Sequence, residues 1–265
     1  MKIFISADIE GIATTATWPE THISEPFFGA FAEQMTREVA AACEGAIAAG
    51  ASEIVVKDAH ATATNIYASQ LPDCVSLIKG WSGHPYSMVD GIDATFDAAV
   101  FIGYHSPAGS GDSPLSHTMS DTPALITING IQTSEFMLYS YAAAYEGVPT
   151  VFLSGDKRLC EQGSALHPLL KTVAVKEGFG GAVKCLSPQK AVERIREESE
   201  KALKQPLNKA KIQLPGRFAM QIRYKEHVVS SAKEYYPGMK RLDETTLAFD
   251  TDDYFEILRA FQFVL

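Results

Sequence analysis

Short apolar runs alternate with longer segments of helical period through the first two-thirds of the chain. The runs predicted as strands are residues 3–5, 54–56, 75–78, 98–102, 125–128, 150–153 and 172–175. Apolar positions spaced three or four apart predict helices over 30–49, 134–146 and 187–204. Such alternation is typical of an α/β fold in three layers, with a largely parallel sheet flanked by helices.

The pattern changes over the last sixty or so residues. Segments 218–224 and 246–249 have the composition of strands in a hairpin or meander. Tyr254, Ile257, Leu258 and Phe261 then recur at helical spacing and predict a closing amphipathic helix. We therefore expect a main α/β domain over residues 1–204 and a smaller C-terminal α+β appendage over residues 205–265, packed on it.

Composition narrows the class of protein. The 265 residues are 46% hydrophobic and 21% charged, which fits a folded globular chain and excludes a disordered one. The 23 lysines and arginines against 32 aspartates and glutamates give a net charge of −9. This acidity disfavours nucleic acid and anionic membranes as partners. It does suit a site that gathers carboxylates around a cation.

The predicted compartment is the cytoplasm. The opening apolar run stops at Asp8, too soon for a signal peptide, and no stretch approaches the roughly 18–20 apolar residues of a membrane span. Cys43, Cys74, Cys160 and Cys185 lie far apart and form no C-x-x-C pair. We expect them to be reduced, in packing positions.

Candidate metal ligands follow three of the predicted strands. The first strand runs into S-x-D-x-E-G at residues 6–11, with Asp8 and Glu10; the second runs into His60 and the fourth into His105. Carboxyl ends of parallel strands share one edge, where open α/β folds bind ligands. Carboxylate and imidazole together suit zinc or a similar ion, and this many ligands can hold two ions around a bridging carboxylate. The chain lacks the common nucleotide-binding, serine-hydrolase and helical zinc-protease motifs.

Each candidate can also have a purely structural role. Asp8 and Glu10 can be loop acids that cap the next helix, and His60 and His105 can be satisfied histidines at strand ends. His117 lies in a loop rich in Gly, Ser and Pro, where surface histidines are common. Glu135 can stabilise a helix dipole, and Asp58 can be a turn acid or a partner of a ligand. The shared strand-end location favours the metal interpretation over these single-residue roles.

Taken together, these segments resemble the zinc-dependent D-aminopeptidase family of the DppA type. The resemblance rests on S-x-D-x-E-G, the K-D-A-H segment ending at His60, G-Y-H ending at His105, S-H at His117 and the N-G…S-E stretch ending at Glu135. It implies two zinc ions per subunit, with Asp8 bridging them, Glu10 and His105 completing one site, and His60 and Glu135 the other. It also implies that His117 is the catalytic residue, described in the family as a nucleophile. Ser134 stands where the family often has glycine.

Three functions are open at this point. The first is a dinuclear-zinc aminopeptidase for short peptides with an N-terminal D-amino acid, in which His117 attacks directly or acts as proton shuttle or oxyanion donor. The second is another dinuclear hydrolase of amides or phosphoesters; against phosphoesters, the site segments lack arginine. The third is a metal-stabilised binding protein without catalysis. His117, which the metal ligands do not require, argues against the third.

The resemblance further implies a homodecamer of two stacked pentameric rings, with the active sites facing an inner channel. Such a cage would admit only short peptides. Candidate contact residues are the Trp-Pro pair at 18–19, the Phe-Phe pair at 27–28 and the turn at 235–237. Alternatively, these side chains cover the core of their own subunit.

Overall fold

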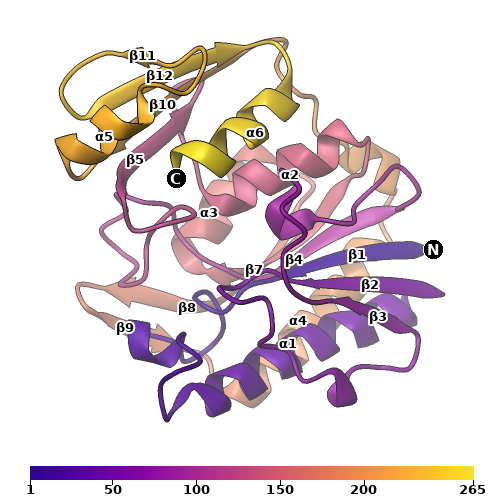
Figure 1. The fold of residues 1–265 in the computed structure, drawn as a ribbon. Helices are drawn as coiled ribbons and strands as arrows, with labels where there is room; N and C mark the ends of the chain where they lie inside the picture. The colour runs from indigo at the N-terminus through magenta and orange to yellow at the C-terminus, as the bar shows by residue number, and fades with distance from the viewer.

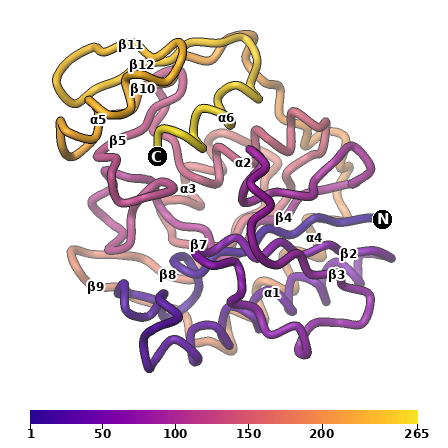
Figure 2. The backbone as a smooth tube through the Cα atoms, viewed as in Figure 1, coloured from indigo at the N-terminus to yellow at the C-terminus, as the bar shows by residue number.

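The computed structural model describes residues 1–265 and contains two β-sheets (Figures 1 and 2). The larger sheet has seven strands in the order β3-β2-β1-β4-β7-β8-β9. All neighbours are parallel except β8 and β9, which form an antiparallel pair that the sequence did not predict. Its strands are β1 (Lys2–Ala7), β2 (Glu53–Asp58), β3 (Val75–Ile78), β4 (Ala98–Tyr104), β7 (Thr150–Asp156), β8 (Lys171–Phe179) and β9 (Ala182–Cys185). The predicted three-layer, largely parallel fold is confirmed.

Helices cover both faces of this sheet (Figure 1). The helices are α1 (Phe28–Ala48), α2 (Glu135–Tyr145), α3 (Lys157–Leu166), α4 (Pro188–Leu203), α5 (His227–Lys233) and α6 (Tyr254–Val264). Strand side chains alternate between faces, so Ile3 and Ile5 join the core beneath α1 and α4, while Phe4 joins the core shared with α2 and α6. The site edge is thus held between two separate hydrophobic cores.

The smaller sheet is antiparallel, in the order β11-β12-β10-β5-β6. Its strands are β5 (Pro123–Ile128), β6 (Ile131–Gln132), β10 (Phe218–Tyr224), β11 (Lys240–Arg241) and β12 (Thr246–Thr251). The segment expected as a main-sheet strand at 125–128 instead pairs with β10, with Ile128 opposite Met220. The prediction of this strand in the main sheet was wrong, because an apolar run predicts a strand but does not show which strand it pairs with. The C-terminal segment shares its sheet with residues 123–132, and a domain boundary at residue 204 remains a prediction.

Short 3₁₀ helices and loops complete the chain. They include η1 (Trp18–Glu20), η2 (Ala68–Gln70), η3 (Ser87–Val89) and η4 (Leu207–Ala210). All four cysteines are free. None of the helices combines the length and the apolar character that crossing a membrane requires.

Candidate active site

Four of the predicted site residues lie just beyond the carboxyl ends of three adjacent strands. Asp8 and Glu10 follow β1, His60 follows β2 and His105 follows β4, in the spatial order β2-β1-β4. Their exposures are 2%, 2%, 7% and 1%, so only a small part of each side chain meets solvent. The expectation that these residues share one edge of the sheet is confirmed.

Glycine in the S-x-D-x-E-G motif is required by a close backbone crossing. The chain leaving β1 passes over the end of β4, where Asp8 N donates to Ile102 O at 2.8 Å and Gly11 N donates to Gly103 O at 2.7 Å. A Cβ atom on Gly11 would lie 1.8 Å from Tyr104 O, so no other residue fits there. This crossing holds Asp8 and Glu10 against the strand that carries His105.

Each of the three histidines has one ring nitrogen fixed by a backbone carbonyl. His60 Nε2 donates to Thr21 O at 2.8 Å, His105 Nδ1 to Ser106 O at 3.0 Å, and His117 Nδ1 to Leu115 O at 2.9 Å. A carbonyl can only accept, so these nitrogens carry protons and the opposite nitrogen of each ring is directed elsewhere. A second partner of this kind orients histidine ligands in metal sites.

The opposite nitrogens all face carboxylates. His60 Nδ1 lies 3.2 Å from Asp8 Oδ1 and 3.0 Å from Glu10 Oε2. His105 Nε2 lies 3.5 Å from Asp8 Oδ2 and 3.3 Å from Glu135 Oε2. Asp8 thus reaches His60 with one oxygen and His105 with the other, the placement that a bridging carboxylate needs.

Glu135 and His117 close the cluster from the other side. Glu135 is the first residue of α2, and its Oε1 accepts from Met119 N at 2.6 Å and lies 3.6 Å from His117 Nε2. The preceding Ser134 caps the helix by accepting from Met137 N at 3.1 Å; its φ of −89° needs no glycine. Glu135 therefore lies beside His105 and His117, whereas His60 lies beside Asp8 and Glu10.

His117 is clamped between two aromatic rings. It stacks on the His105 ring with centroids 4.2 Å apart and planes 6° apart, and Trp18 of η1 meets it edge-on at 5.2 Å. The sequence interpretation placed Trp18 in a subunit contact and missed this role. Because Thr21 at the end of η1 also accepts the His60 hydrogen bond, one short turn braces two histidines of the cluster.

The electrostatics of the cluster call for positive charge. Burial and the neighbouring Glu10 raise the pKa of Asp8 well above its ordinary range. Although burial opposes the charged imidazole, Glu135 and Asp8 raise the pKa of His105 to about 10. Protons would therefore gather on the histidines wherever no other cation neutralises the buried carboxylates.

A metal ion satisfies that need. Glu10 Oε2 and His105 Nε2 are buried without a hydrogen-bond partner, despite the short distances to charged neighbours. Two sets of side chains bring ligand atoms within 4.8 Å of one another, one of Asp8, Glu10 and His105 and one of His105, His117 and Glu135. Carboxylate oxygen and imidazole nitrogen are the donors that zinc accepts, so the residues fit such an ion.

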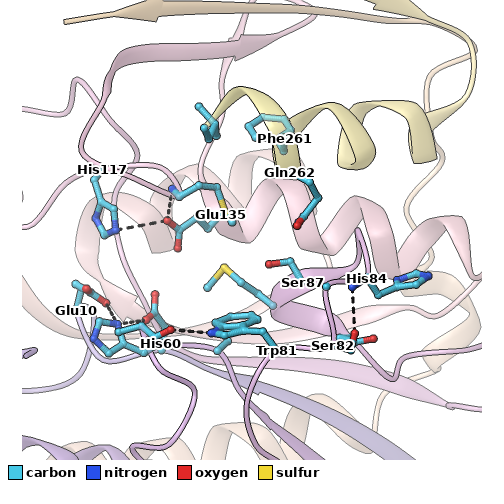
Figure 3. A pocket seen from close by; sticks show the side chains of 18 residues that line it. Glu10, His60, Trp81, Ser82, His84, Ser87, His117, Glu135, Phe261 and Gln262 are labelled. Carbon is cyan, nitrogen blue, oxygen red and sulfur yellow. Dashed lines mark hydrogen bonds and ion pairs between the residues drawn. The ribbon is translucent and has the colours of Figure 1, made fainter. Parts of the chain in front are cut away.

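A cavity of about 430 Å³ opens from the cluster (Figure 3). Beyond Asp8, Glu10, His60, His117 and Glu135, its lining includes Phe261 of the predicted closing helix and residues that the sequence did not single out: Trp81, Ser82, Met88, Asp90, Met119, Gln262 and Leu265. His84 also lines the cavity. No lysine or arginine does. Met119 lies two residues after His117, whereas the other residues come from the loop of residues 81–90 and from the C-terminal segment, which no sequence pattern joins to the motifs.

Two further motif residues have structural roles. Asp58 accepts from the backbone of Asn65 and Ile66 at 2.5 and 2.9 Å and so shapes the loop that carries His60. The Lys57 ammonium is buried and donates to Asp58 O and Gly80 O. These contacts support the role of Asp58 as a turn acid.

The fold and this cluster define an α/β protein with the ligand set of a metal-dependent hydrolase. The family model for D-aminopeptidase, peptidase family M55, matches residues 1–263, and the chain belongs to that family. The D-aminopeptidase of Bacillus subtilis strain 168 is 30% identical over 262 residues, covering 98% of this chain and 95% of its own. The solved structure of the Zn-dependent D-aminopeptidase DppA from Bacillus subtilis, a self-compartmentalizing protease, is similar with a TM-score of 0.93. It is 29% identical, and the match covers all of this chain and 96% of that one. The resemblance seen in the motifs is thereby confirmed.

Proposed function

We propose that this protein is a dinuclear-zinc aminopeptidase that removes N-terminal D-amino acids from short peptides. The observation that carries the proposal is the convergence of three carboxylates and three imidazole nitrogens, with each imidazole anchored from behind by a backbone carbonyl. Family membership and the zinc-dependent relative support the same metal and substrate class.

Asp8, Glu10, His60, His105 and Glu135 would hold the zinc ions, with Asp8 shared between two. Zinc in such a site polarises a carbonyl oxygen and lowers the pKa of bound water to roughly 7. The two oxygens of Asp8, directed at His60 and His105, support the shared role.

His117 is the catalytic residue in this proposal. Its Nδ1 is held by Leu115 O, so Nε2 is the atom presented to the cavity and to Glu135. From that position Nε2 can attack the scissile carbonyl carbon, or accept a proton and return it to the leaving amine. Trapping a covalent acyl adduct on His117 would select the first role, and its absence under single-turnover conditions the second.

The zinc ligands also fit an exopeptidase. A free N-terminal amine of the substrate, in its neutral form, would be a further nitrogen donor for a zinc ion held by Asp8, Glu10 and Glu135, whereas an internal peptide bond offers no such donor. The lining of the cavity holds no lysine or arginine, which argues against a phosphoester as the substrate.

The proposal is tested by metal analysis paired with an assay. Purified protein should carry about two zinc ions per chain and hydrolyse D-alanyl peptides in preference to their L-alanyl counterparts. Activity on phosphoesters with no activity on D-alanyl peptides, in the presence of zinc or manganese, would overturn it.

For the assembly we propose a homodecamer of two pentameric rings in the cytoplasm. The self-compartmentalizing relative supports it, as do the exposed Phe27 (71%) and Tyr235 (83%), whereas Phe28 is buried in its own subunit. Four free cysteines fit the reducing compartment. Light scattering should report a particle about ten times the mass of the chain, and a fully active monomer at assay concentration would contradict the proposal.

A further inference from the structure

The two ends of the cavity differ in chemistry (Figure 3). The end beside Glu10 and His60 holds the buried cluster of carboxylates and imidazoles. The opposite end is formed by the loop of residues 81–90 and by Gln262 of α6. Met88, Met119 and Phe261 contribute apolar surface to the same lining. A short peptide held at the cluster by its reacting bond would therefore extend over apolar surface toward this second, polar end.

Asp90 at that end is held in place by hydrogen bonds. Its Oδ2 accepts from the Ser82 hydroxyl, and Ser82 Oγ in turn accepts from His84 N at 3.1 Å. The loop itself is tied to the wall of the site, because Trp81 Nε1 donates to Ala61 O at 2.7 Å and Gly80 N donates to Ala63 O at 2.9 Å. The carboxylate thus has a fixed position at the edge of the cavity.

No cation pairs with Asp90. The Lys57 ammonium lies over the Trp81 ring, 4.1 Å from its centroid, and donates to two backbone carbonyls. Burial lowers the pKa of Lys57, and the charges of Asp58 and Asp90 partly offset that shift. Lys57 does not line the cavity. Asp90 is therefore a hydrogen-bond acceptor with a fixed position at the polar end of the cavity. Its carboxylate can accept a hydrogen bond from a donor group of a ligand.

We propose that Asp90 and Ser82 form a subsite that binds a hydrogen-bond donor of the peptide substrate and discriminates against a free carboxylate. The inference rests on the proposed function, since it takes the scissile bond to lie at the histidine cluster. The donor is the amide N–H of a chain that continues past the leaving residue, or the ammonium of a basic side chain. A dipeptide, whose carboxylate follows directly after the leaving residue, meets the negative charge of Asp90 with no basic side chain in the cavity lining to offset it.

The experiment compares D-Ala-D-Ala with its C-terminal amide and with D-Ala-D-Lys amide. Wild-type protein should have a higher kcat/KM for the amide than for the acid. Asp90→Asn keeps an acceptor for Ser82 and removes the charge, so it should lower this preference by about three- to tenfold, the scale of one partly screened charge a few ångströms away. Asp90→Lys should reverse the preference. Asp73→Asn, which removes an exposed charge outside the cavity, is the matched control and should keep the wild-type ratio.

The comparison of the two amides shows whether the donor is a backbone N–H or the ammonium of a basic side chain. A preference for D-Ala-D-Lys amide over D-Ala-D-Ala amide that disappears in Asp90→Asn assigns the subsite to a basic side chain, and its absence assigns it to the backbone amide. An acid-to-amide ratio that is the same in wild type, Asp90→Asn and Asp73→Asn overturns the subsite.

Binding of the same peptides, measured by calorimetry, tests the subsite even if the protein does not hydrolyse them. If the protein hydrolysed none of these peptides, that result would count against the proposed function. An amide preference in binding that Asp90→Asn removes would still support the subsite, and equal binding by both proteins would overturn it.

Discussion

The two walls of the cavity are built on different principles. One consists of strand ends: Asp8, Glu10, His60 and His105 project from three adjacent parallel strands and are almost fully buried. The other consists of the loop carrying Trp81, Ser82 and His84, together with Gln262, all of them exposed. The first wall gathers charge in a buried place where it acts strongly, and the second presents neutral donors, acceptors and one carboxylate to solvent.

This difference suggests a division of labour. Groups that must hold a fixed mutual geometry are on strands anchored by two hydrophobic cores. Groups that meet the variable part of a substrate are on a loop and a terminal helix, which can change without disturbing the sheet. Substitutions in the first wall should therefore affect metal binding and turnover, and those in the second should affect substrate preference.

The largest effect is expected at Asp8. Asp8→Ala should lose both metal ions, whereas His60→Ala should lose mainly one. Loss of the metals removes several kcal/mol of transition-state stabilisation, so activity should fall by about a thousandfold or more. Metal analysis by mass spectrometry checks this, with Asp73→Ala as the exposed control. Full occupancy in Asp8→Ala would falsify the bridging role.

His117 offers the next test, because it touches the first wall without belonging to it. His117→Ala should keep both metals and lose about 10²–10⁴-fold in kcat, the usual contribution of a placed proton-transfer group. The His105, His117 and Glu135 group allows the other outcome, in which His117 is itself a ligand. Loss of one ion from His117→Ala would establish that outcome and remove His117 from its catalytic role.

The first wall could be predicted from the sequence and the second could not, for a physical reason. Asp8, His60 and His105 each follow an apolar run directly, and parallel strands bring such positions to one edge whatever their separation in the chain. Trp81 and Gln262 line one cavity although they are far apart in the chain and belong to a loop and to α6, and no local pattern encodes that arrangement.

The same limit explains the errors in the fold. The strand at 125–128 was predicted, but its partner in the second sheet was not. Helix α3 was missed because it starts directly after β7 and has Gly163 in its interior, where a glycine usually weakens a helix. Here the helix needs that glycine, since a Cβ would lie 3.0 Å from Leu153 and Leu170 side-chain atoms.

A smaller effect is expected on the free energy of unfolding, at a buried carboxyl beneath the first wall. Glu38 of α1 is fully buried beneath the loop after Glu10, and its Oε1 accepts from Ala13 N at 2.9 Å and Gln34 Nε2 at 2.8 Å. Burial raises the pKa of Glu38 from 4.5 to about 7. The folded state thus prefers the protonated acid, and this contribution to stability is complete below pH 4.5 and is lost as the pH rises through 7.

Glu38→Gln keeps the acceptor and removes the charge. It should raise the free energy of unfolding by about 1–3 kcal/mol at pH 8 and change it little at pH 5. Urea unfolding of the variant and wild type at the two pH values measures the difference. An equal change at both would mean that the Glu38 carboxyl does not titrate in this range.

The smallest effect is expected at Trp18, which lies in a partly exposed turn and packs against His117 of the buried cluster. Trp18 does not line the cavity, so its loss should leave KM nearly unchanged. An edge-on aromatic pair contributes about 0.5–1.5 kcal/mol, so Trp18→Leu should lower kcat by roughly two- to twelvefold if the ring fixes His117. Trp18→Phe keeps an aromatic edge and should restore most of the rate. Phe27→Leu, which changes a residue that precedes α1 and lies outside the cluster, is the control.

Light scattering on all three variants separates this role from the subunit contact that the sequence suggested. If the loss in kcat followed a loss of assembly, or if Phe27→Leu showed the same loss, Trp18 would act through the oligomer and not through His117.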